Sequence, residues 1–180
     1  MSDSTINQDR DIAAVLENFE LESFVPYLLN QAMGQLKNVL HQTLKPHGLS
    51  IHQWRVMIML RLRGSVSIGE ISAHTVMGQS TITRVADQLE RAGLARREPL
   101  KNNNRIILLC LTDSGSELIE HVLPLVIAIN EAALQGIDDK EQQLLFRLLE
   151  KVATNTRRYG ARQEFELDEW HGRQARAIAS

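Results

Sequence analysis

Residues 67–111 decide the fold, and they read SIGEISAHTVMGQSTITRVADQLERAGLARREPLKNNNRIILLCL. The stretch divides into a short helix, a turn, a second helix, and two apolar β-like runs around a polar loop. In the second helix, apolar residues recur with the three-to-four spacing of one buried stripe. These residues are Ile82, Val85, Leu89 and Leu94. Gly93 is the expected left-handed residue that ends this helix. The pattern predicts a helix-turn-helix followed by a β-hairpin.

The start of the second helix is polar on the face opposite the stripe. Its side chains are short donors and acceptors and one long cation: Gln79, Ser80, Thr81, Thr83 and Arg84. A DNA-reading helix needs this arrangement, because its N-terminal side chains reach base edges in the major groove. The alternative is an ordinary amphipathic helix whose polar residues face water.

The hairpin is basic and has turn residues at its tip. Residues 94–97 and 105–111 predict two strands, and residues 99–104 have turn chemistry. Residues 64–67 predict a small third strand beside them. A helix-turn-helix with such a hairpin is a winged helix. The wing residues expected to meet DNA are Arg97, Lys101, Asn102, Asn103, Asn104 and Arg105.

These segments also resemble a known family. The motifs S-T-x-[ST]-R and D-x-L-E-x-x-G-L in the second helix, and L-T-x-x-G after the hairpin, are similar to those of the MarR family of winged-helix transcriptional regulators. GLSIHQWRVMIMLRLRG and HVLPLV are similar to the family's second and fifth helices, so the resemblance spans about residues 26–152. One departure lies in the wing, where the family carries D-x-R. Arg105 is retained, but Asn103 stands at the acidic position.

The charge of the chain is concentrated where DNA would bind. The net charge is −2, yet residues 50–105 hold nine Lys and Arg against four acids, a local charge of +5. The remainder carries −7. Neutralising DNA phosphates requires such a basic patch, so the location of the positive charge says more about DNA binding than the net charge of the chain does.

The flanking segments predict helices with more apolar surface than a small domain can cover. Helices are expected over residues 22–44, 51–63 and 113–134, with Thr112 as an alternative start for the third, and from Asp138 onward. Their apolar excess predicts a two-fold dimer that presents two recognition helices to successive major grooves. The expected fold is mainly α, a winged helix-turn-helix domain with long N- and C-terminal dimerisation helices.

The expected domain boundaries follow from these segments. They are an N-terminal arm at 1–21, an N-terminal dimerisation helix at 22–49, a winged helix-turn-helix DNA-binding domain at 50–111, C-terminal dimerisation helices at 112–160, and a C-terminal tail at 161–180. A helical extension is the alternative for the tail.

Several classes of protein are disfavoured by the sequence. No run approaches 18 apolar residues and no signal pattern opens the chain, so a cytoplasmic protein without membrane contact is expected. The single cysteine, Cys110, excludes an intrachain disulfide and lies in an apolar run typical of a buried thiol. No catalytic motif or cofactor loop is present, so an enzyme is not expected. His41, His47 and His52 lie near one turn, but without interleaved carboxylates or cysteines no metal site is expected.

The resemblance implies control by a small lipophilic anion, such as an aromatic carboxylate or its thioester. An apolar slot with a few polar groups is the physical requirement. Candidate ligand-binding residues are Tyr27, Met33, Lys37, His41, Trp54 and Arg55. For Trp54 and residues 57–59 the alternative is plain core, and for Lys37 a solvated face.

The functional hypothesis is a homodimeric, sequence-specific regulator of transcription. It would bind an inverted repeat in double-stranded DNA, most plausibly as a repressor that the effector releases. The alternatives are a regulator controlled by metal or oxidation, and a constitutive architectural DNA-binding protein.

Overall fold

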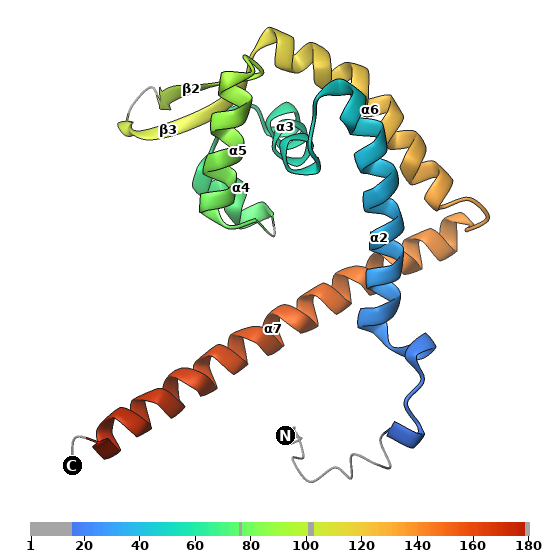
Figure 1. Cartoon of the computed structure of the whole chain (residues 1–180), viewed down its shortest axis with the longest axis vertical. Coiled ribbons are helices and arrows are strands. Elements are labelled where there is room, and N and C mark those ends of the chain that lie inside the picture. Colours follow the sequence, from blue (N-terminus) through green and yellow to red (C-terminus); the bar gives the residue numbers. More distant parts are fainter. Residues whose placement is uncertain (1–15, 76, 101–102, 179–180) are drawn as a thin grey trace. The chain divides into compact units, whose positions relative to one another are not determined.

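The computed structural model describes residues 16–75, 77–100 and 103–178, and Figure 1 shows it. It forms two units, Met1–Ala133 and Leu134–Ser180. In the first unit the helices are α2 (Val25–Leu44), α3 (Ile51–Arg63), α4 (Ile68–His74), α5 (Gln79–Arg91) and α6 (Asp113–Ala133). Short 3-10 turns, η1 (Leu21–Ser23) and η2 (Lys45–His47), precede and follow α2. The strands are β1 (Val66–Ser67), β2 (Ala95–Leu100) and β3 (Asn103–Leu111). This arrangement confirms the mainly helical winged helix-turn-helix fold.

Helix ends follow the expected capping chemistry. Ser50 Oγ accepts from the Gln53 amide at 3.2 Å, and Gln53 Oε1 accepts from the Ser50 amide at 2.8 Å, which forms a capping box before α3. Thr112 caps α6, because its Oγ1 accepts from the Gly115 amide at 3.1 Å. The sequence had left Thr112 and Asp113 open for this role. Satisfying these first amides stabilises a helix start by about 1 kcal/mol each.

The wing is a three-stranded antiparallel sheet in the order β1-β3-β2. Val66 and Arg97 flank Leu109 from either side in the register of the sheet. The predicted strands were too short, because pairing continues to Leu100 and begins at Asn103. A shift of register between Pro99 and Leu100 makes this possible on an edge strand, where proline is tolerated.

The core joins the winged helix to α2 and α6. Its fully buried large side chains are Leu44, Val56, Met57, Ile71, Ile82, Leu89, Leu109, Ile119 and Val122. They come from α2, α3, α4, α5, β3 and α6, so all these elements share one apolar interior. Figure 1 shows the C-terminal end of α2 beside the middle of α6, and the two helices are in contact.

The second unit contains the helix α7 (Asp139–Ile178). Asp138 caps it as predicted, since its carboxylate accepts from the amides of Lys140 and Glu141 at 2.8 and 2.9 Å. The backbone stays helical through residues 161–178, the segment for which a tail and a helical extension were both open. None of the described helices has the length and apolarity needed to cross a membrane.

Candidate nucleic-acid interface

Helix α5 separates a buried stripe from an exposed polar face. Ile82, Val85 and Leu89 are buried against α3, α4 and β2, as their spacing predicts. The proposed reading residues lie on the remaining surface, with Gln79, Ser80, Thr83 and Arg84 exposed and Thr81 half-buried. The Thr83 hydroxyl donates to the Gln79 carbonyl at 2.9 Å, so its lone pairs stay available as acceptors.

The hairpin of β2 and β3 projects beside α5, as Figure 1 shows. Asn103 opens β3 opposite Leu100. Lys101 and Asn102 lie outside the described residues, and Asn104 and Arg105 are described only as part of the β3 backbone. The structure therefore places the base of the wing next to the recognition helix.

Arg97 fastens the wing to the recognition helix. Its Nη2 lies 2.7 Å from Asp87 Oδ1, and its Nη1 lies 2.6 Å from Glu90 Oε2. The Arg97 amide also donates to Glu90 Oε1 at 3.2 Å. The hydrogen bond to Asp87, with the charge of Glu90 as a further cause, raises the pKa of Arg97 above its ordinary value. The Arg97 side chain is 29% exposed, and its guanidinium is bound by the protein's own carboxylates.

The carboxylates that hold Arg97 were missed as functional residues. In the sequence, Asp87 and Glu90 are two of the four acids among residues 50–105. Their spacing of three residues places them on one helix face, which was the available signal. The strand partner could not be identified from spacing, because it depends on how β2 crosses α5.

Arg96 has a different set of partners from its neighbour. Its Nε lies 2.6 Å from Glu98 Oε1, and its Nη1 donates to the Leu111 carbonyl at 3.1 Å. Successive side chains of a strand point to opposite faces, so Arg96 braces the hairpin while Arg97 holds it to α5.

A groove of about 460 Å³ lies between α3 and the end of α4. Its apolar wall is Ile58, Met59 and Leu62, and its polar groups are Arg55, Arg63, His74 and Thr75. Of the predicted ligand-binding residues, Arg55 lines it. Glu70 lies nearby: its pKa is lowered first by hydrogen bonds from Ser67, and also by the charges of Arg63 and His74. The groove combines an apolar surface with positive charge.

The other predicted ligand-binding residues do not line this groove. Trp54 is 6% exposed and belongs to the core, the alternative that the sequence left open. Met33, Lys37 and His41 are exposed along α2, and Tyr27 accepts a hydrogen bond from Gln31 on the same helix. The predicted group is therefore divided between the surface of α2, the core, and the groove.

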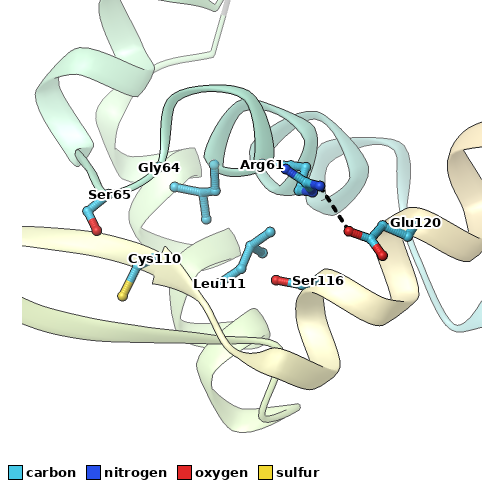
Figure 2. A pocket seen from close by; sticks show the side chains of 8 residues that line it. Arg61, Gly64, Ser65, Cys110, Leu111, Ser116 and Glu120 are labelled. Carbon is cyan, nitrogen blue, oxygen red and sulfur yellow. Dashed lines mark hydrogen bonds and ion pairs between the residues drawn. The ribbon is translucent and has the colours of Figure 1, made fainter.

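A second cavity of about 370 Å³ lies where α3, β3 and α6 approach one another. Figure 2 shows Arg61 Nη2 facing Glu120 Oε1 across it, and these atoms are 2.9 Å apart. Both side chains are about half exposed, at 49% and 59%. Cys110 borders this cavity, and burial raises the pKa of its thiol.

The histidines near the turn before α3 have separate partners. The rings of His47 and His121 meet edge to face with centroids 5.2 Å apart. His52 Nδ1 lies 3.1 Å from Met77 Sδ. Across the described part of the chain, no three His, Cys, Asp or Glu side chains gather as a metal site requires.

Comparisons with known proteins agree with this geometry. The sequence profile of the MarR family matches residues 49–107. The HTH-type transcriptional repressor IacR of Pseudomonas putida is 29% identical over 139 residues, which cover 77% of this chain and 83% of IacR. A solved MarR-family transcriptional regulator from Silicibacter pomeroyi is 30% identical with a TM-score of 0.68, covering 81% of this chain and 96% of its own. The structure of BpsR from Bordetella bronchiseptica, whose DNA binding is regulated by 6-hydroxynicotinic acid, has a TM-score of 0.69 at 24% identity and covers 75% and 96% of the two chains.

Proposed function

Because the chain belongs to the MarR family of transcriptional regulators, we propose that it is a dimeric repressor released from its operator by a small apolar anion. It is a regulator of transcription and not an enzyme. The observation that carries the proposal is the exposed polar face of α5 beside a basic wing, on a body whose other helices expose apolar stripes.

The DNA contacts divide between the recognition helix and the wing. Gln79, Ser80, Thr81, Thr83 and Arg84 meet base edges and phosphates in the major groove. Lys101 and residues 102–104 reach the flanking minor groove, with Arg105 anchoring them. Arg97, first grouped with these residues, holds the wing in place through Asp87 and Glu90.

The dimer buries apolar surface that the single chain leaves exposed. On α2, side chains that are 38–48% exposed follow one another along the helix: Leu28, Leu29, Met33, Leu36 and Val39. Leu125 and Ile127 on α6 and Leu144, Phe146, Leu148 and Leu149 on α7 are also exposed. Apolar surface of this extent, on α2 and α6 and separately on α7, marks an interface, and a second copy satisfies it with two-fold symmetry.

The effector site is the groove between α3 and α4. Arg55 pairs with the carboxylate of the ligand, and Ile58 and Met59 contact its apolar part. The groove reaches His74 and Thr75, which end α4 and lead into the turn before α5. A ligand that binds more tightly to one position of α4 than to another favours that position, and the recognition helix that follows α4 moves with it. BpsR, regulated by an aromatic carboxylate, supports this choice of ligand class.

The direct test is selection of DNA by the protein. The full chain is incubated with a random DNA pool, and bound duplexes are sequenced. We expect an inverted repeat whose half-sites lie about 10–10.5 base pairs apart, centre to centre. Enrichment of no common sequence would instead support an architectural DNA-binding protein. Titration of 6-hydroxynicotinic acid and other aromatic carboxylates into the complex, read by fluorescence anisotropy, then tests release.

A further inference from the structure

The end of the recognition helix is joined tightly to the start of α6. The Thr112 hydroxyl donates to the Gly93 carbonyl at 2.7 Å and accepts from the Gly115 amide at 3.1 Å. The Thr112 amide donates to the Leu94 carbonyl at 3.2 Å. Gly93 ends α5 with a left-handed φ of 69°. One threonine thus connects the residue that terminates α5 to the first turn of α6.

Gly115 allows the two backbones to approach this closely. A Cβ on Gly115 would lie 2.0 Å from the Leu94 carbonyl oxygen and 2.9 Å from its carbon. Gly115 is buried in the first turn of α6. A glycine is therefore required by the space available at this position. We call residues 93–94 and 112–115 the joint.

The joint connects the winged helix to α6 more tightly than the polar contact between α3 and α6, the pair Arg61–Glu120, whose side chains are about half exposed and border the second cavity. An exposed ion pair contributes only about 0.2–1 kcal/mol and is weakened by salt. The joint instead combines two hydrogen bonds from Thr112, to Gly93 and Leu94, with direct backbone contact at Gly115, so α6 and the end of α5 move together.

We propose that Thr112 is a positioning residue that sets the separation of the two recognition helices. This inference rests on the proposed function, in which α6 belongs to the dimer interface and each α5 reads one half-site. If α6 is fixed by the dimer, the angle at the joint fixes where each α5 lies on DNA. A rigid joint then makes the protein selective for the spacing between half-sites. One base pair of extra spacing moves a half-site by about 3.4 Å and turns it by about 35° around the DNA axis.

The test compares Thr112→Val with Thr112→Ser in the full chain. Valine keeps the shape of the side chain but can neither donate to Gly93 nor accept from Gly115, whereas serine retains both hydrogen bonds. The probes are the inverted repeat that the wild type selects, duplexes with one base pair added or removed between half-sites, and a duplex with one half-site. Affinity is measured by fluorescence anisotropy.

We expect the wild type and Thr112→Ser to lose at least about tenfold in affinity when the spacing changes. Thr112→Val should lose less than about threefold, with its affinity for one half-site unchanged within about twofold. An undiminished spacing penalty in Thr112→Val overturns the inference and leaves the proposed function intact. A wild type that ignores spacing overturns the inference alone, and one that selects no inverted repeat overturns both.

Hydrogen exchange in the wild-type protein gives a second measurement that needs no variant. The amides of Thr112 and Gly115 donate to Leu94 and to Thr112 in the joint. They should be protected to the same degree as the buried turns of α5. Exchange of both amides at the rate of an unstructured chain would show that the joint opens freely and would overturn the inference even if Thr112→Val does not fold.

Discussion

Arg97 shows how much one side chain's role depends on its partners. Counted by charge, it belongs with the cations that neutralise phosphates. In the structure its planar guanidinium meets two carboxylates of α5 at 2.7 and 2.6 Å. A fork of five donors suits such an arrangement, and lysine, with a single ammonium group, does not reproduce it. The effect of Arg97 on DNA binding therefore passes through the position of the wing.

A double-mutant cycle separates positioning from direct contact. Lys101→Ala should weaken DNA binding across sequences and lower the slope of log affinity against log salt by about one. Arg97→Gln should weaken binding in the wild type and have a smaller further effect in the Lys101→Ala background, because part of the wing contact is already lost. Fully additive losses would mean that Arg97 meets DNA itself. Loss of the two ion pairs of Arg97, with Asp87 and Glu90, should lower Tm by at most about 4–8 °C.

Cys110 should be unreactive in the folded protein. Burial is the first cause that raises the pKa of its thiol, so less of it is thiolate at neutral pH, and burial also restricts access to the sulfur. We expect iodoacetamide at pH 7.5 to modify native Cys110 at least about tenfold more slowly than the same thiol in denaturant. Mass spectrometry of the quenched protein measures both rates. Equal rates would favour the oxidation-responsive alternative.

At the scale of elements, local chemistry was enough to predict most of the fold. Ser50 with Gln53, Gly93, and Asp138 each end or begin a helix through contacts within a few residues. The extent of the hairpin was harder to predict. Strand β2 continues beyond Arg97 because it pairs with β3, and a local pattern does not show that pairing. The groove lined by Arg55 was the hardest feature to predict. Its walls come from α3 and α4, and amphipathic spacing cannot say which neighbouring helix faces Arg55.

The joint makes a prediction about helix α6. Gly115→Ala should destabilise the protein, because its Cβ would meet the Leu94 backbone at 2.0 Å. Overpacking of this kind costs about 1–3 kcal/mol, which lowers Tm by about 2–4 °C per kcal/mol. Gly69→Ala is the matched control in α4, where a Cβ would meet nothing closer than 4.0 Å. Thermal unfolding of both variants by circular dichroism measures the difference, and equal Tm values would contradict the close approach.

The groove between α3 and α4 predicts which variants lose effector response. Arg55→Ala should need at least about tenfold more aromatic carboxylate for DNA release, the effect of losing about 1.4 kcal/mol of binding energy. Its operator affinity without ligand should stay unchanged. Lys37→Ala and His41→Ala on α2 should respond as the wild type does. A shifted response in those two variants alone would place the ligand along α2, where Lys37 and His41 lie.

At the scale of the whole molecule, the exposed apolar surface determines the oligomeric state. Sedimentation equilibrium at low micromolar concentration should give about twice the chain mass of 20.4 kDa. Met33→Glu on α2, where the side chain is 44% exposed, should shift the equilibrium toward monomer by placing a charge in the interface. Gln143→Glu is the control: it adds the same charge at an exposed polar site on α7 and should leave the equilibrium unchanged. A wild type that sediments as a well-folded monomer would contradict the dimer and the spacing argument together.

The contact between Gly115 and Leu94 also sets a rule for building hybrid regulators. When the DNA-binding segment of one relative is grafted onto the body of another, the obvious point at which to join the two sequences is the end of the wing, after Leu111. That crossover takes Leu94 and Gly115 from different parents, so the close fit between them is lost wherever the parents differ. A crossover after Gly115 keeps the fit from one parent. The transferable cassette for changing operator choice therefore runs four residues past the last strand.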